Sequence, residues 1–541
     1  MKLFIFLILF AIFSYAQKKQ IPKILLEWEK NPNQSPLIDF SYAGYHQGKE
    51  LPTRHYQAIG RTFYDVTNFG AIPNDGKDDI EAIQRAVDFV GQNGGGIITF
   101  PPGVFDFDVN TQKKFVVIRY SNVILSGYGE NIDGTVLYDH SPSDYHDFSK
   151  KWLAGLFPSF FLISPLENDT SDYHPISNIT NQLTSVASAK RGSTKLIVKN
   201  PEQLFIGQTY LLTQKSEDTS MVAEIVYPLP KDKISEGHLY IGNSTDAWGY
   251  KFQTLITIVD IQKNQVTIDA PLTWNIYEKY NPVIWKIPVI HESGIENFTL
   301  RTAWKEEFFH HKNPIHDNGW DAIRVRYAVN CWVRTIRFEN VSSAVHFVST
   351  KNCVVYDCRI TGNPGHNGFV LSGASTYNLF YRLQGGQQMH TYSLNGFVSG
   401  NVISKSFSEE PSSIDSHGTL GIYNLFDNMH GCVMRSGGNQ SVTSPLHGRG
   451  LVLWNIALGL LNPYNYRIVE DICNINQYPG LIAVGVYSPY HQPIYFIGED
   501  GTRIYKDRKN NWAIIELHNQ IINIPSLYEY QRAKRFKTNL Y

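Results

Sequence analysis

The feature that most limits the possible folds of this chain is a repeat in its C-terminal half. Five asparagines each precede a strand-like apolar run, at Asn330, Asn352, Asn378, Asn401 and Asn424, and subtraction gives intervals of 22, 26, 23 and 23 residues. Short strands separated by polar turns at this interval predict a solenoid in which each turn, or rung, is one repeat. Equivalent residues of neighbouring rungs then lie about 4.8 Å apart. The asparagines can therefore hydrogen-bond to one another, and we predict that they are structural.

Residues 63–107 predict how the solenoid begins. A strand ends at Gly70, the polar turn Asn74-Asp75-Gly76 follows, and apolar residues at helical spacing predict an amphipathic helix over 79–92. This segment resembles the N-terminal cap of the pectate-lyase-like superfamily. The resemblance implies an all-β fold, a single-stranded right-handed parallel β-helix with an N-terminal capping helix. The superfamily contains lyases, hydrolases, transferases and phage tailspikes, so the resemblance does not fix the reaction.

The pattern changes between residues 183 and 290, where strands are joined by hairpin-like turns. This predicts a small antiparallel β-domain inserted into the solenoid, and irregular extra rungs are the alternative. The whole chain is expected to divide into a signal peptide (1–16), an N-terminal leader (17–60), the β-helix cap and first rungs (61–182), the inserted β-domain (183–290), the main β-helix with the active face (291–465), and a C-terminal β-hairpin and helix cap (466–541).

The first residues predict export. Lys2 is followed by an apolar run from Leu3 to Phe13, too short to span a bilayer, and then by small residues that favour cleavage after Ala16. We expect a secreted or periplasmic protein, with no membrane insertion because no later stretch is long and apolar enough. A net charge of −1 offers no field that would attract nucleic acid. We expect a monomer.

The cysteines do not form a disulfide framework. There are five of them, and an odd number leaves at least one unpaired. Cys331 and Cys353 each follow an asparagine and lie 22 residues apart by subtraction. We expect them to be small core residues stacked on neighbouring rungs.

Aligning the rungs on the asparagines predicts one chemically active face. The third and fifth places of each strand are apolar and point inward, so Arg324 and His346 stack on the outer side, while Asp321 and His390 lie at the strand entrance. The register of the last strand is ambiguous by two residues. The residues expected on this face are Trp320, Asp321, Arg324, His346, His366, Asn367, His390, Tyr392, Asp415, His417, His447 and Arg449.

Two reactions fit these residues. Hydrolysis normally needs two carboxylates, which Asp321 and Asp415 would supply, with His390 or His417 sharing the proton transfer. These four residues are the candidate catalytic set, and the other members of the face are candidate substrate-binding residues. Acids and histidines outnumber cations on the face, which slightly favours a glycoside hydrolase.

The alternative reaction is β-elimination by a polysaccharide lyase. It needs a base beside a uronic carboxylate and a cation that neutralises that carboxylate. His390 or Tyr392 would be the base, and Arg324 or Arg449 the cation. The third possibility is a non-catalytic glycan-binding β-helix, which would have aromatic and polar columns without paired acids and bases.

The expected substrate is an extended anionic polysaccharide, sulfated or uronic. Relatives of this superfamily that act on algal polysaccharides include sulfated-fucan hydrolases as well as lyases. Pectate lyases of this fold bind calcium through clustered acidic residues, and these rungs carry no such cluster. We therefore expect neither a metal ion nor another cofactor.

Overall fold

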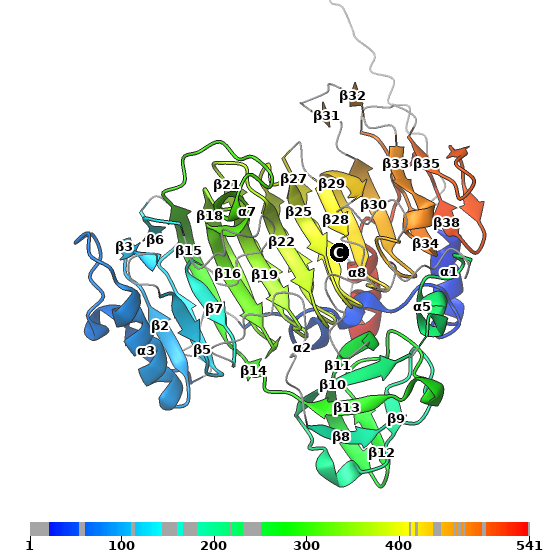
Figure 1. Cartoon of the computed structure of the whole chain (residues 1–541), viewed down its shortest axis with the longest axis horizontal. Coiled ribbons are helices and arrows are strands. Elements are labelled where there is room, and N and C mark those ends of the chain that lie inside the picture. The colour runs from blue at the N-terminus through cyan, green and yellow to red at the C-terminus, as the bar shows by residue number, and fades with distance from the viewer. Residues whose placement is uncertain are drawn as a thin grey trace, which may run out of the picture.

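The chain folds into a long stack of parallel strands with a smaller sheet attached to its side (Figure 1). The computed structural model describes residues 21–52, 60–109, 114–131, 133–142, 159–165, 181–216, 218–230, 250–409, 413–416, 420–436, 445–458, 461–462, 467–468, 471–489 and 494–538. The predicted signal peptide 1–16 and its cleavage site lie outside these residues. Among the described helices, none is both long and apolar enough to cross a membrane.

Strands of successive rungs pair in parallel along three ladders, which makes the stack a parallel β-helix. The first ladder contains β1 (Phe63–Asp65), β2 (Gly96–Thr99), β5 (Val123–Ser126), β15 (Gly294–Thr302), β18 (Trp332–Glu339), β20 (Val354–Tyr356), β23 (Leu379–Tyr381), β26 (Val402–Ser404), β29 (Leu425–Ser436), β30 (Val452–Leu458), β34 (Leu481–Val484) and β38 (Ala513–Glu516). The second adds β3 (Gly103–Phe107), β6 (Thr135–Asp139), β21 (Arg359–Thr361), β24 (Gln384–Gly385) and β27 (Phe407–Ser408), which pair with the later residues of β15, β18 and β29.

The third ladder runs beside the other two, and most of its strands face the viewer in Figure 1. It contains β4 (Val116–Ile118), β7 (Phe161–Ile163), β16 (Asp321–Arg326), β19 (Ser343–Val348), β22 (Asn367–Ser372), β25 (His390–Leu394) and β28 (Ser413–Ser416), and it ends on β29. Its inward side chains, such as Ile323, Val345 and Phe369, belong to the main apolar core. The residues between them point outward and form the face analysed below.

The asparagine repeat forms a hydrogen-bonded column, but two of its five members stand one position away from it. Asn378, Asn401 and Asn424 stack in register: the Nδ2 of Asn378 donates to Oδ1 of Asn401 at 2.9 Å, and the Nδ2 of Asn401 donates to Oδ1 of Asn424 at 3.0 Å. In the earlier rungs this place is taken by Cys353, whose backbone N–H donates to Oδ1 of Asn378 at 2.9 Å, and by Cys331.

Asn330 and Asn352 precede the column, in left-handed backbone conformations with φ of 54° and 52°. Tyr377, with φ of 53°, is the corresponding residue of the next rung. Asparagine tolerates this conformation well. The uneven interval of 26 residues in the sequence therefore comes from mixing two neighbouring columns, and the true interval from Cys353 to Asn378 is 25 residues by subtraction.

Helix α3 (Ile80–Gln92) lies against the first rungs. Its buried side, which includes Ile83, Val87 and Val90, belongs to the main core. Asp79, just before the helix, makes no side-chain capping bond to it. Its carboxylate instead accepts hydrogen bonds from the backbone N–H groups of Ile72 and Asp106, which ties the start of the helix to the neighbouring strand β3.

Six described strands between Gln182 and Lys286 form a separate sheet in which every neighbouring pair is antiparallel. Its order is β8 (Gln182–Ser185), β13 (Val283–Lys286), β10 (Thr209–Lys215), β11 (Tyr250–Gln262), β12 (Gln265–Ile268) and β9 (Lys195–Ile197). Helix α5 (Ser220–Ile225) follows β10. The short helices η4 (Pro201–Gln203) and η6 (Glu278–Tyr280) lie between its strands.

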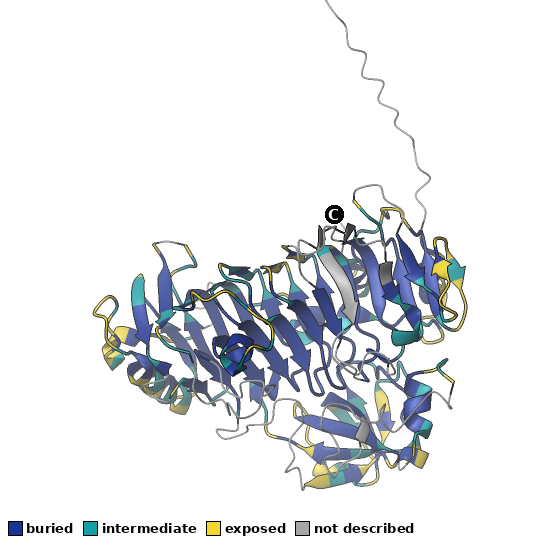
Figure 2. Ribbon diagram, turned by 45° about the horizontal axis from the view of Figure 1, so that its top comes forward, coloured by how far each residue is buried: buried dark blue, intermediate teal, exposed yellow. Residues whose placement is uncertain are grey.

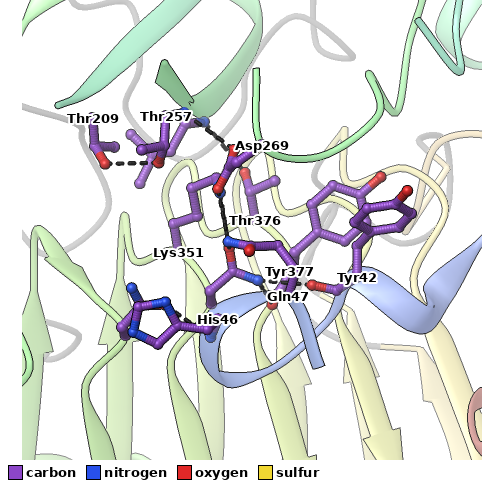
Figure 3. A network of polar contacts seen from close by, with 12 residues as sticks. Tyr42, His46, Gln47, Thr209, Thr257, Asp269, Lys351, Thr376 and Tyr377 are labelled. Atoms are coloured by element: carbon purple, nitrogen blue, oxygen red, sulfur yellow. Dashed lines mark hydrogen bonds and ion pairs between the residues drawn. The ribbon is translucent and has the colours of Figure 1, made fainter. Parts of the chain in front are cut away.

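This sheet contacts the solenoid through a buried polar network (Figure 3). Asp269, just after β12, accepts hydrogen bonds from the Nζ of Lys351 on the solenoid and from Nε2 of Gln47 in the leader. Thr254 and Thr376 are joined through their hydroxyls at 3.1 Å. Three segments that are distant in sequence therefore meet at one ion pair.

The two ends of the described chain pack together on the outer side of the first ladder. Helix α8 (Leu527–Phe536) contacts η1 (Phe40–Tyr42), and the blue leader lies next to the red helix in Figure 1. The second apolar cluster joins residues of the leader, the solenoid and α8, including Leu25, Phe40, Val354, Leu379, Val402, Leu425, Leu527 and Tyr528. The terminal helix thus covers the side of the solenoid. The sequence predicts instead that it caps the C-terminal end of the solenoid.

The remaining short elements are α1 (Lys23–Lys30), α2 (Tyr45–Gly48), η3 (Val66–Phe69), β14 (Ile290–His291), α7 (Pro314–Asn318), β17 (Ala328–Val329), β31 (Leu461–Asn462), β32 (Arg467–Ile468), β33 (Asp471–Asn474), η7 (Ile475–Gln477), β35 (Tyr495–Ile497), β36 (Arg503–Ile504) and β37 (Arg508–Lys509). β35 and β36 form an antiparallel hairpin with the turn Asp500-Gly501. This is the hairpin that the sequence indicates.

Candidate active site on the third ladder

The third ladder carries two outward columns of mostly polar side chains. One column follows Asp321, Ser343, Asn367 and His390, which pair in consecutive rungs. The other follows Arg324, His346, Val370, Ser393 and Asp415. Arg324 and His346 therefore stack on neighbouring rungs. The two-residue ambiguity of the last strand is also removed, because Asp415 pairs with Ser393, whereas His417 lies outside the described residues.

The two predicted catalytic aspartates are too far apart to act together. Asp321 is on β16 and Asp415 on β28, with β19, β22 and β25 between them. Four steps of about 4.8 Å separate these strands by about 19 Å. Paired carboxylates of glycosidases stand about 5–9.5 Å apart. The expected acid pair is thus wrong, and the face divides into two groups.

The first group surrounds a buried ion pair. A guanidinium nitrogen of Arg324 donates to Oδ2 of Asp321 at 2.8 Å, and the hydroxyl of Ser342 donates to Oδ1 of the same carboxylate at 3.1 Å. One rung on, Nε2 of His346 lies 2.7 Å from the Ser372 hydroxyl. Burial and then the charges of Arg324 and Arg326 hold the pKa of His346 well below its usual value. His346 is therefore a neutral ring.

The second group is a row of histidines. The rings of His366 and His390, on neighbouring rungs, have centroids 5.4 Å apart. His310 and His311 come from the loop of residues 303–320 between β15 and β16, and the His310 ring lies 5.1 Å from His366 and 5.7 Å from His390. One ring nitrogen from each of His310, His311 and His366 lies within 4.8 Å of the other two.

Asp317 on α7 holds two of these histidines. Its carboxylate lies 2.9 Å from Nδ1 of His311, and its backbone carbonyl lies 3.2 Å from Nδ1 of His366. Burial alone would raise the pKa of Asp317, but the hydrogen bonds from the side chain and backbone of His311 oppose it, and the pKa is lowered. Burial, followed by the neighbouring His390, lowers the pKa of His366 to about 3.

Asp415 stands at the other end of the row. Its Oδ1 lies 3.8 Å from Nδ1 of His390. Both groups are almost inaccessible, with Asp415 2% and His390 6% exposed. A carboxylate at this distance favours the protonated form of an imidazole through its charge.

The loop of residues 303–320 covers a face that sequence analysis expects to be open. Phe308 stacks over His366 at 6.4 Å, and α7 lies in front of the third ladder in Figure 2. The loop is attached to the neighbouring turn, since Nδ2 of Asn363 donates to the Trp304 carbonyl at 3.0 Å. The His310 ring of this loop also lies 5.7 Å from the His390 ring, so the loop forms one wall of the site around His390.

Two predicted binding residues are buried in other surroundings. Tyr392 occupies the inward third place of its strand, stacks on Phe369 at 5.9 Å, and donates its hydroxyl proton to the Phe407 carbonyl at 2.8 Å. It belongs to the core and cannot be the base. Trp320 is 4% exposed and hydrogen-bonds through its backbone to Ser342, so it offers no stacking surface.

Two further predicted residues lie away from the third ladder. His447 extends the asparagine column, with Nε2 2.9 Å from Nδ2 of Asn424 and Nδ1 2.7 Å from the Gly448 carbonyl. Arg449 stacks over the Tyr227 ring at 5.2 Å, next to α5. The glycines that flank Arg449 have a packing reason: a Cβ at Gly448 would lie 2.7 Å from a side-chain carbon of Ile225, and Gly450 has a left-handed φ of 78°.

Sequence reasoning misses His310, His311 and Asp317. They lie in a loop that does not follow the repeat, so aligning rungs cannot find them. The signal that was available is local: His310, His311, His316 and Asp317 fall within eight residues.

Comparisons with known proteins give a partial family match and distant structural likenesses. A family described as "Domain of unknown function (DUF4955)" matches residues 386–539. No curated protein matches.

The tailspike protein gp49 from Pseudomonas phage LKA1 is 11% identical, with a TM-score of 0.46, and the match covers 79% of this chain and 71% of that one. DFA-IIIase from Arthrobacter chlorophenolicus A6, in complex with GF2, is 10% identical, with a TM-score of 0.42, covering 81% and 92%. The Gp54 tailspike of Acinetobacter baumannii bacteriophage AP22, in complex with capsular saccharide, is 10% identical, with a TM-score of 0.42, covering 82% and 69%.

Proposed function

We propose that this chain is an exported enzyme that cleaves an extended anionic polysaccharide at the third ladder, by β-elimination beside a uronic carboxylate. The observation that carries the proposal is the pair of His390 and Asp415, 3.8 Å apart on neighbouring rungs. A histidine next to a carboxylate is a group that can take and return a proton near neutral pH.

In this reaction His390 removes the proton from C5 of the uronic residue. The electrons of the C5–H bond form a double bond between C4 and C5, and the C4–O bond breaks. The leaving oxygen takes up the proton that His390 holds, which returns His390 to its neutral form. Asp415 stabilises the protonated His390 ring between the two steps.

Hydrolysis is the second candidate. It loses the support of an acid pair made by Asp321 and Asp415, because four rungs separate them. It keeps the support of Asp317 and Asp415, which stand at the two ends of the histidine row.

The proposal includes three assignments from the sequence. Residues 1–16 are a signal peptide, α3 caps the first rungs of a right-handed solenoid, and residues 183–290 are a domain inserted into it. The packing of α3 on the first rungs and the antiparallel pairing of residues 182–286 support the last two.

The test is to incubate the full mature chain with pectic, alginate, glycosaminoglycan and fucan polysaccharides. Elimination leaves an unsaturated sugar that absorbs in the ultraviolet, whereas hydrolysis leaves new reducing ends without that absorbance. We expect His390→Asn and Asp415→Asn each to lower the rate by about 100-fold or more. His140→Asn is the matched control, because its ring is 44% exposed and lies at the second ladder.

Three outcomes would contradict the proposal. Reducing ends without unsaturation would establish the hydrolase. Binding without cleavage of any substrate would favour a glycan-binding protein. Full activity in a folded Asp415→Asn variant would remove the assignment of His390 and Asp415.

A further inference from the structure

We infer that His310, His311 and His366 bind a late first-row divalent cation of the Zn²⁺ type. The inference deepens the proposed function, because the histidines border His390. Binding of the cation can nevertheless be measured without any polysaccharide.

The three histidines meet from two different parts of the chain. His310 and His311 belong to the loop over the third ladder, and His366 precedes β22. One nitrogen of each lies within 4.8 Å of the others. In a tetrahedral site with Zn–N bonds of 2.0–2.1 Å the nitrogens stand about 3.4 Å apart, so small ring rotations complete the site.

The backbone brings two consecutive histidines to the same side. Neighbouring side chains of an extended segment point in opposite directions. His311 instead has a left-handed φ of 59°, and its ring centroid lies 3.4 Å from that of His310.

Asp317 prepares two of the rings for a metal. Its carboxylate faces Nδ1 of His311 and its carbonyl faces Nδ1 of His366. Both contacts place the ring proton on Nδ1, so the lone pair is on Nε2. A carboxylate or carbonyl behind the ligand nitrogen is the usual outer partner of metal-binding histidines.

Three neutral imidazoles suit Zn²⁺ and its neighbours better than Ca²⁺ or Mg²⁺, which prefer oxygen ligands. Three protein ligands also leave a fourth position for water or substrate. The exposed ring of His310 gives the ion a path from solvent.

Elimination needs a cation that neutralises the uronic carboxylate, and a metal ion at this site would be in position to do so. The His310 and His366 rings lie 5.7 and 5.4 Å from the His390 ring. A cation held there stands next to the proposed base, where it can bind the uronic carboxylate and offset its charge as the neighbouring proton leaves. This role rests on the proposed function.

The experiment uses the full mature chain, purified without a histidine tag and freed of metal with a chelator. Calorimetric titration with Zn²⁺ should show one equivalent bound, and bound Co²⁺ should give the visible spectrum of a tetrahedral site. His310→Ala should weaken Zn²⁺ binding by at least about 10-fold, and Asp317→Asn, which removes the negative charge behind His311 and His366, by about 10- to 100-fold. His140→Ala is the control and should bind as the parent chain does.

Unchanged Zn²⁺ affinity in His310→Ala, or no stoichiometric binding by the parent chain, would overturn the inference. Because the His310 side chain is exposed, its loss leaves the core intact, and the metal-free melting temperature checks that the variant is folded. Zn²⁺ binding without any polysaccharide cleavage would leave the metal site standing and remove the proposed function. Cleavage that persists in the metal-free chain would show that the cation has no part in the reaction.

Discussion

At the scale of single residues, the asparagine column shows how buried polar groups are satisfied in this solenoid. Each amide both donates to and accepts from its neighbours, and the column ends on the ring of His447. Burial lowers the pKa of His447 to about 4 from the ordinary value of 6.5, although the hydrogen bond to the Gly448 carbonyl acts in the opposite direction. The ring is neutral in the folded chain at neutral pH.

This shift predicts a loss of stability in acid. As the pH falls from 6.5 to 4, the unfolded chain binds a proton at residue 447 that the folded chain excludes. The contribution of the neutral His447 ring to the free energy of unfolding is therefore complete above pH 6.5. About 3 kcal/mol of it is lost by pH 4. His447→Asn removes the titrating ring, so urea unfolding at several pH values should show a shallower acid loss. An unchanged pH dependence in this variant would contradict the assignment, and His140→Asn is the control.

The same column shows what can be predicted from sequence. The repeat length and the inward or outward direction of Arg324 and His346 follow from simple alternation, which the pairing bears out. The chemical identity of the column does not follow, because a cysteine thiol fills the place of an asparagine in two rungs. A small buried acceptor is required there, and more than one residue type meets that requirement.

At the scale of elements, the antiparallel sheet is joined to the solenoid by the ion pair of Lys351 and Asp269. The side chains are 1% and 7% exposed. Breaking a buried pair from one side leaves an uncompensated charge and costs about 3–5 kcal/mol. We therefore expect Lys351→Met to lower the free energy of unfolding by about that amount.

A double-mutant cycle separates the pair from its surroundings. Adding Asp269→Asn to Lys351→Met removes the orphaned charge and should restore part of the lost stability in urea unfolding. Lys279→Met breaks an exposed pair with Glu224 and should change stability by less than about 1 kcal/mol. Equal effects of Lys351→Met and Lys279→Met would show that the buried contact is not a structural joint.

The position of the loop of residues 303–320 could not be predicted from the repeat of the rungs. Rung alignment treats it as a connection, yet it covers the third ladder and supplies His310, His311 and Asp317. Its position depends on contacts such as that of Asn363 with Trp304, between residues about 60 positions apart. No periodic signal in the sequence records such a contact.

At the scale of the whole molecule, the leader and α8 cover the side of the solenoid together. The apolar outer residues of the first ladder, such as Val402 and Leu425, would otherwise face solvent. Gln531 holds the two ends: its Oε1 accepts from the Phe40 backbone N–H at 2.8 Å, and its Nε2 donates to the Ile38 carbonyl at 2.9 Å. These contacts join residues more than 490 positions apart in sequence.

Gln531→Ala should therefore release the covering segments. The substitution leaves a buried N–H and a buried carbonyl without partners, at a cost of about 2–4 kcal/mol. Because only the leader and α8 lose contacts, we expect protease cleavage within residues 21–52 under native conditions, while the solenoid stays intact. Gln520→Ala, at an exposed position near the same helix, is the matched control. If both variants resist protease equally, the two hydrogen bonds of Gln531 do not hold the ends together. The covering segments must then be held by other contacts between them, such as those of Tyr528 with the Ala43 carbonyl and of Arg532 with the Gly48 carbonyl.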